Sequence, residues 1–141
     1  MKLSVLILAL IPAAAFAQSS RDYATMSLMM WAAFQCGYYA ASMDDTLEAE
    51  RLYNLGVEEG RDFLVALEAG QLDQADMQHV VPVGVSLLLG GPSHDFIIGR
   101  IFESVMMDTA EQLYAEGNFD EALARSRAQV AFQEANCASI R

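Results

Sequence analysis

The two cysteines are the residues of this chain whose chemistry is most readily predicted. Cys36 lies near the start and Cys137 near the end of 141 residues. In an oxidising compartment such a pair usually forms one disulfide, and closing a loop of about 100 residues stabilises a fold by up to ~4.7 kcal/mol in the chain-entropy model. Two free thiols or a reactive Cys36 nucleophile are the alternatives, although neither Lys nor His neighbours Cys36 in the sequence. We therefore predict a bridge between Cys36 and Cys137.

An aromatic stripe in the first helical segment has the chemistry of a binding surface. At helical spacing, Trp31, Phe34 and Tyr38 point to one side. Trp, Tyr and Met are favoured at interfaces, so this side is a candidate interaction surface, as a ligand groove or a partner-binding face. The uncharged stretch 23–43 has two other interpretations, a fully surrounded core helix and a membrane span. Its Ser, Thr, Gln and paired Tyr residues argue against the span.

Motifs for hydrolytic or metal chemistry are weak in this sequence. It contains no Gly-x-Ser-x-Gly elbow and no His-Glu-x-x-His pair. Asp76 and His79 form the best pair of metal ligands, but one pair is not a site, and the methionines form no repeated array of the kind that binds Cu(I). A glycan hydrolase would have to use Glu59 with Glu103 or Asp108. We expect no cofactor and no metal, and the residues favour a binding protein over an enzyme.

The first 17 residues have the pattern of a secretory signal peptide. One lysine precedes an uncharged apolar run, and Ala15-Phe16-Ala17 is a small-x-small cleavage site before Gln18. A membrane anchor is the alternative, but Pro12 and the alanines shorten the apolar run below the roughly 20 residues that span a bilayer. We predict removal of residues 1–17, which leaves 18–141 as a single helical domain that is periplasmic or secreted.

The predicted mature chain is strongly acidic. Loss of residues 1–17 removes the only lysine, Lys2, and leaves arginines alone against 19 Asp and Glu. This charge repels nucleic-acid phosphates and anionic lipid headgroups, so neither is an expected partner. A protein partner is expected, and a basic one fits the charge. The simplest interpretation of the acidity is that it keeps an exported protein soluble.

The elements that must position these residues are predicted to be helices throughout. In residues 18–141 the apolar side chains recur at helical spacing, with no strand-like alternation and no Asn-Gly or Asp-Gly hairpin signal. The first helix is expected over about 22–42. The second begins at the N-cap Asp45 and ends at Gly70, and Gly56 and Gly60 within it allow close packing against a neighbour.

Capping residues predict further helices in the second half of the chain. Asp73 can cap a short helix, and a break near Val81, caused by Pro82, is followed by a short buried helix over 83–89. Ser93 caps the longest helix, which is expected to end at Gly117.

That longest helix is expected near the centre of the bundle. Its apolar residues form two stripes on nearly opposite sides: Ile98, Ile101, Phe102, Val105, Thr109 and Leu113 on one, and Phe96, Met107 and Tyr114 on the other. A helix that is apolar on two sides is usually surrounded by others. A last helix is expected from Asn118, with three apolar positions: Leu123, Val130 and Phe132.

Together these features predict an all-α, compact bundle of about five helices, whose N- and C-terminal helices are joined by one disulfide. The expected function is that of an exported, non-enzymatic binding protein, such as an inhibitor or immunity-type partner of another envelope or secreted protein. The first alternative is a carrier or sensor of a small apolar ligand held between the first and fourth helices. A hydrolase with buried carboxylates is the second. The oligomeric state, and whether Glu59 reaches water or pairs with Arg100, stay open.

Overall fold

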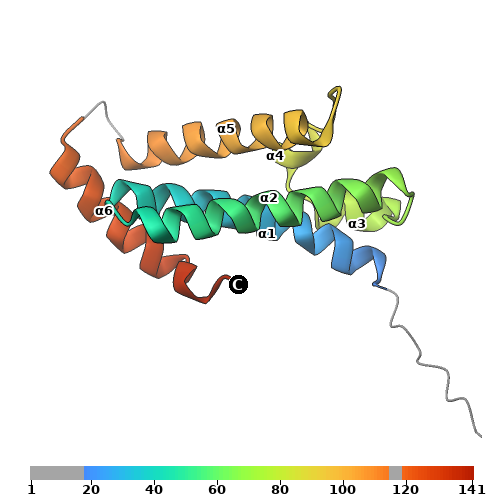
Figure 1. Ribbon diagram of the computed structural model, residues 1–141, viewed down its shortest axis with the longest axis horizontal. Coiled ribbons are helices and arrows are strands. Elements are labelled where there is room, and N and C mark those ends of the chain that lie inside the picture. The colour runs from blue at the N-terminus through green and yellow to red at the C-terminus, as the bar shows by residue number, and fades with distance from the viewer. Residues whose placement is uncertain (1–17, 115–118) are drawn as a thin grey trace, which may run out of the picture.

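The computed structural model describes residues 18–114 and 119–141, and Figure 1 shows them as an assembly of helices. The α-helices are α1 (Ser20–Ser42), α2 (Thr46–Glu68), α3 (Gln74–His79), α4 (Val83–Ser86), α5 (His94–Leu113) and α6 (Glu121–Glu134), and a 3-10 helix, η2 (Cys137–Ser139), follows α6. No strand occurs in this described part. The predicted all-α fold is confirmed.

Side-chain caps fix the starts of α2, α3 and α5. The side chains of Asp45, Asp73 and Ser93 accept hydrogen bonds from backbone N–H groups three residues ahead, at 3.2, 2.8 and 3.2 Å, as predicted. At the start of α1, Ser19 and Asp22 form a reciprocal capping box that the sequence analysis did not identify.

The ends of the last two helices differ from the prediction. Helix α5 ends at Leu113, before the expected Gly117, and α6 begins at Glu121, after the expected Asn118. Gly117 and Asn118 lie outside the described residues. Helix α6 starts where it does because the Asp120 carboxylate accepts a hydrogen bond from the Leu123 N–H at 3.0 Å.

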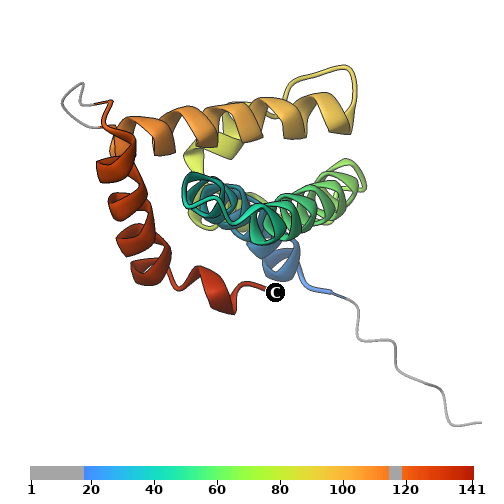
Figure 2. The same cartoon turned by 60° about the vertical axis from the view of Figure 1, so that its left-hand side comes forward.

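Helix α1 is the central element of the bundle. It packs side by side with α2 along its length, and α5, α6 and the C-terminal turn surround this pair on three sides (Figure 2). Met30 and Phe34 of α1 belong to a core cluster shared with α2 and α5, whereas Cys36 and Tyr39 belong to a second cluster shared with α6 and η2. Helix α1 therefore contributes side chains to both hydrophobic clusters of the core.

The prediction that the helix after Ser93 is the longest and lies at the centre is wrong, since α5 has 20 residues and both α1 and α2 have 23. One stripe of α5 is buried as expected, with Ile98, Ile101 and Val105 at most 4% exposed. On the other side, Phe96 and Met107 are 48% and 67% exposed. Helix α5 is thus a peripheral helix: Phe96 and Met107 of its second stripe face solvent, whereas Tyr114, at the end of that stripe, is partly buried against the second core cluster.

Two shorter elements are also less buried than predicted. Helix α4 ends at Ser86, and Val85 is its only buried residue, so the expected buried helix over 83–89 is not formed. Helix α6 packs through Ala124 and Ala128, whereas Leu123 and Val130 are 36% and 52% exposed. Small side chains let the α6 backbone approach α1 closely, and of the larger ones only Phe132 is partly buried against the second core cluster.

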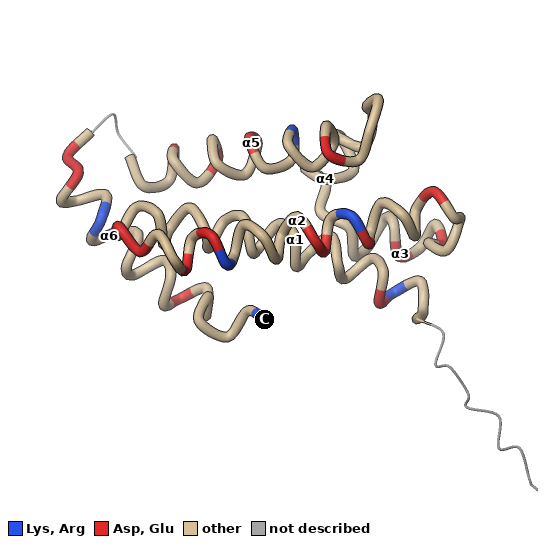
Figure 3. Tube along the Cα trace, viewed as in Figure 1, with Lys and Arg blue, Asp and Glu red and all other residues tan. Residues whose placement is uncertain are grey.

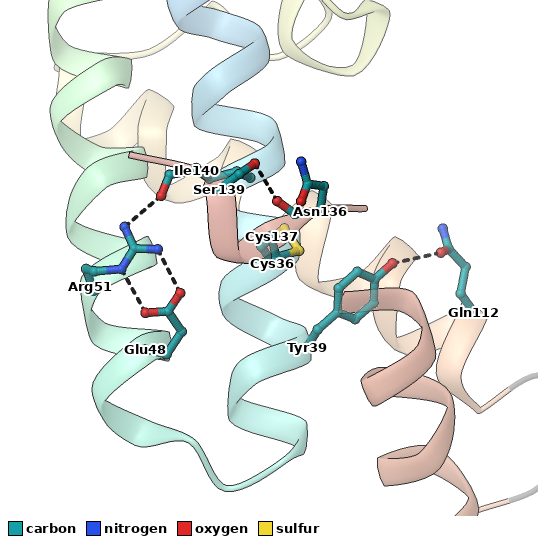
Figure 4. Close-up of a disulfide and its surroundings, with 9 residues drawn as sticks. All are labelled: Cys36, Tyr39, Glu48, Arg51, Gln112, Asn136, Cys137, Ser139 and Ile140. Carbon is teal, nitrogen blue, oxygen red and sulfur yellow. Dashed lines mark hydrogen bonds and ion pairs between the residues drawn. A yellow bond between two sulfur atoms is a disulfide. The ribbon is translucent and has the colours of Figure 1, made fainter. Parts of the chain in front are cut away.

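The predicted disulfide is present. Cys36 and Cys137 are bonded with their Cα atoms 5.6 Å apart, and both are buried (Figure 4). Cys137 lies in η2, directly after α6, where Asn136 adopts a left-handed conformation (φ 53°) that redirects the chain toward α1. Arg51 of α2 also donates a hydrogen bond to the Ile140 carbonyl at 2.9 Å, so the C-terminal turn is attached to both central helices.

None of the described helices is long and apolar enough to cross a bilayer. The predicted signal peptide, residues 1–17, lies outside the described residues.

Candidate functional site

An apolar groove lies where α1, α2 and α5 meet. We call it the α5 groove; its volume is about 290 Å³, and it opens to solvent. Its lining residues are Phe34, Gly37, Tyr38 and Ala41 of α1, Ala49, Glu50 and Tyr53 of α2, and Phe102 and Met106 of α5. Glu50 is the one charged residue among them.

Small residues on α1 and α2 form part of the lining of the α5 groove. A Cβ atom added at Gly37 would lie 3.5 Å from the Ala49 carbonyl oxygen and 3.6 Å from the Leu52 Cβ, which shows how closely the two helices approach. With only Gly37, Ala41 and Ala49 at this place, no long side chain fills the space in front of the helix pair. The hollow is therefore a consequence of the small residues at this contact.

Three aromatic rings, one from each helix, pack together along the α5 groove. The centroid of Phe102 lies 5.1 Å from that of Phe34 and 5.2 Å from that of Tyr53, both in T-shaped geometry, and the Phe34 and Tyr53 centroids are 6.0 Å apart. Edge-to-face contacts of this kind stabilise ring clusters by about 0.5–1.5 kcal/mol per pair beyond the area that they bury. The rings therefore give the groove a preformed aromatic wall.

The α5 groove presents little charge to whatever enters it. Burial raises the pKa of Tyr38 above its ordinary value, and the neighbouring Tyr114 raises it further, so the Tyr38 hydroxyl stays neutral. The Glu50 carboxylate is exposed at the rim. A surface of this composition binds apolar or aromatic groups and has no nucleophile with an adjacent base.

The structure divides the predicted interaction surface between two places. Phe34 and Tyr38 both line the α5 groove, with Phe34 buried and Tyr38 half-buried. Trp31 does not line it, because its ring packs against α4, where a Cβ atom added at Gly84 would lie 2.5 Å from the Trp31 Cη2. The role of these residues in binding remains a prediction.

Sequence reasoning assigned only two of the nine groove residues to a site. Among those it missed, Phe102 and Met106 lie on α5, and Tyr53 lies on α2, where it is 45% exposed. At helical spacing Tyr53 shares the apolar side of α2 with Gly60 and Leu64, and this was the available signal. Which helix would face it depends on the packing of α5, which no local pattern specifies.

The carboxylates considered for hydrolysis do not meet in one cleft. Glu59 lines a hollow near the start of α1 with Asp22, whereas Glu103 and Asp108 line another beside α5, and the two hollows share no residue. Burial raises the pKa of Glu59, and the nearby Asp62 and Glu58 add to the shift.

Arg100 does not pair with Glu59. Its guanidinium donates a hydrogen bond to the Gly90 carbonyl at 2.8 Å and lies 5.8 Å from the centre of the Phe96 ring. These contacts hold the Arg100 side chain at the N-terminal end of α5.

The candidate metal pair serves the fold in this structure. Asp76 accepts a hydrogen bond from the Ser20 hydroxyl at 2.6 Å and lies 3.9 Å from the Arg21 guanidinium, which attaches α3 to the start of α1. His79 is exposed at the end of α3. Within the described ranges, no three His, Cys, Asp or Glu side chains are grouped so that they could hold a metal ion.

Comparison of the chain with models of known protein families, with curated proteins and with solved structures finds no match.

Proposed function

We propose that this protein is an exported, non-enzymatic binding protein that receives an apolar side chain of a protein partner in the α5 groove. The observation that carries the proposal is the combination of a preformed aromatic wall, small residues in the lining and an opening to solvent. Aromatic and methionine side chains around a pocket are typical of the centres of protein interfaces.

The openness of the groove favours a protein partner over a small molecule. Sites for drug-sized ligands are clefts that bury most of the ligand surface. The α5 groove opens to solvent, so it would leave much of a bound small molecule uncovered. A partner that inserts a side chain covers this opening with its own surface.

The disulfide supports export. A buried bridge between Cys36 and Cys137 needs an oxidising compartment to form and persist, and the leader pattern of residues 1–17 leads to the same compartment. A small acidic domain in the periplasm or outside the cell fits an inhibitor or immunity-type partner of another envelope or secreted protein.

A carrier or sensor of a small apolar ligand is the second candidate. The α5 groove lies between α1 and α5, the pair of helices expected to hold such a ligand, and its lining is almost entirely apolar. It lies beside Phe34 and Tyr38, whereas Trp31 is covered by α4.

Filling the groove tests both candidates. Ala41 is exposed and lines the groove, so Ala41→Trp places an indole in it without disturbing the core; Ala122→Trp, at an exposed site on α6 outside the groove, is the matched control. We expect wild-type protein and Ala122→Trp to capture the same stoichiometric protein from the native envelope fraction, and Ala41→Trp to lose it. Quantitative proteomics of the captured material is the measurement.

The outcome that contradicts the partner proposal is equal capture by all three proteins, or no stoichiometric capture by any of them. Titration with a neutral fluorescent dye, N-phenyl-1-naphthylamine, supplies the second readout. Saturable dye binding that Ala41→Trp abolishes, in the absence of a captured protein, would favour the ligand carrier.

A further inference from the structure

We infer that the partner segment that enters the α5 groove is basic as well as apolar, with Lys or Arg side chains next to the apolar side chain that fills the groove. The inference rests on the proposed function and adds the charge of the partner to it. Two observations support it. The carboxylates along the groove have no ion-pair partner in the described part of the chain, and the arginines near them bind other groups.

The α5 groove continues along α5 into a second hollow. This hollow is lined by Tyr38, Phe102, Glu103, Met106, Met107 and Ala110. Because it shares Tyr38, Phe102 and Met106 with the α5 groove, the two form one apolar surface with a carboxylate on each flanking helix, Glu50 on α2 and Glu103 on α5. An occupant longer than one side chain therefore passes between two negative charges.

Both carboxylates lack an internal counter-ion. Glu50 and Glu103 are exposed and make no hydrogen bond or ion pair within the described ranges, and no Arg or His lines either hollow. Some acids outside the groove are paired within the protein: Glu48 with Arg51, Asp95 with Arg61, and Asp44 with Arg125. The two groove carboxylates are thus negative charges that a partner can neutralise.

The arginines near the groove are engaged by other groups. Arg61 lines a neighbouring hollow with Tyr53 and Phe102 but pairs with Asp95 at 3.0 Å. Arg100 lines a hollow with Glu103, but its guanidinium donates to the Gly90 carbonyl at 2.8 Å and makes no ion pair with Glu103 in the described part. Arg51 contacts Glu48 and the Ile140 carbonyl, and Arg127 donates to the Leu113 carbonyl. From residue 101 onward every charged residue of α5 is acidic, as the tube in Figure 3 shows.

An apolar surface beside two carboxylates favours Lys and Arg side chains, which combine an apolar stem with a positive head group. Arg and Lys stems are apolar and their heads are positive, so they lie along apolar surface and reach carboxylates beyond it. A guanidinium can also stack on the exposed Tyr53 ring. A neutral segment would leave the two carboxylates unpaired, and an acidic segment would be repelled by them.

Selection from a random peptide library, with the mature chain as bait, tests the inference. Peptides that bind wild-type protein but not Ala41→Trp are sequenced, and their dissociation constants are measured. We expect these peptides to combine aromatic or aliphatic residues with neighbouring Lys or Arg. We also expect Glu50→Gln/Glu103→Gln to weaken their binding about 3- to 10-fold at low salt, and added salt to reduce the difference. Glu58→Gln/Glu134→Gln, which removes the same charge outside both hollows, is the control and should bind as wild type.

The possible failures are distinguishable. If groove-dependent peptides are neutral or acidic, or if the groove and control double variants lose equal affinity, the inference is overturned and the proposed function stands. If no peptide is enriched, or if Ala41→Trp binds every enriched peptide as well as wild type, the proposed function fails together with it.

Discussion

Gly56 shows how closely α2 packs over α1. A Cβ atom at this position would lie 2.5 Å from Cε1 of Phe34, whose ring is 1% exposed and held by the aromatic cluster. The neighbouring Gly60 has a similar role, since a Cβ atom there would lie 2.6 Å from the Met30 sulfur. The expectation that these two glycines allow close packing is therefore confirmed.

Two helical glycines should respond in opposite directions to replacement by alanine. Gly56→Ala should lower the free energy of unfolding by about 1–3 kcal/mol, because the methyl group overpacks a filled core. Gly99→Ala should raise it by about 0.5–1 kcal/mol, because Gly99 of α5 has open space around its missing Cβ and alanine favours the helix. Urea unfolding of both variants measures the changes. Equal effects would show that the Phe34 ring yields to the added methyl group.

The residues of the α5 groove show where sequence reasoning ends. Phe34 and Tyr38 were recognisable as a stripe because one helix determines their common side. Tyr53 and Phe102 join them through contacts between helices, and those contacts depend on how α5 lies on the α1–α2 pair. Contacts between elements also explain why Trp31, on the same stripe, is covered by α4 instead.

At the scale of elements, α6 depends most on the disulfide. Its buried residues are the alanines Ala124 and Ala128, which bury little apolar area, and the bridge from Cys137 to Cys36 lies just beyond its end. Helices α1 and α2, by contrast, share large buried side chains such as Phe34 and Phe63. The covalent link therefore contributes a larger share of the attachment of α6 than of the other long helices.

Removal of the bridge should release α6 first. We expect Cys36→Ala/Cys137→Ala to lower the free energy of unfolding by about 2–5 kcal/mol and to speed amide hydrogen exchange in α6 far more than in α1 and α2. Hydrogen exchange followed by mass spectrometry measures this, and wild-type protein treated with reductant is the parallel sample. Unchanged protection of α6 would contradict this prediction, because it would show that the contacts of α6 hold the helix in place without the disulfide.

The helix starts were predictable and the helix environments were not. The caps Asp45, Asp73 and Ser93 each bond a backbone N–H only three residues ahead, so their capping role can be predicted from the local sequence. The exposure of Phe96 and Met107 depends on which elements cover α5, a tertiary property. An apolar stripe indicates that a side can be buried, and the rest of the fold decides whether it is.

At the scale of the whole molecule, charge and apolar surface are arranged around the α1–α2 pair. The net charge is −11 with both histidines neutral, and four of the arginines form ion pairs with acidic residues of the described part. The aromatic groove is exposed within this negative surface. The proposed function predicts that this arrangement attracts cationic partners at long range and binds them by apolar contact at short range.

The central claim is that the α5 groove contacts a protein partner, and site-specific photo-cross-linking tests it most directly. The photoreactive residue p-benzoylphenylalanine replaces Tyr53 at the groove or, as the control, Val130 on the exposed side of α6. After irradiation of the native cells, we predict one discrete protein adduct from the Tyr53 position and none from Val130. No adduct at Tyr53, or the same adducts at both positions, would contradict the claim.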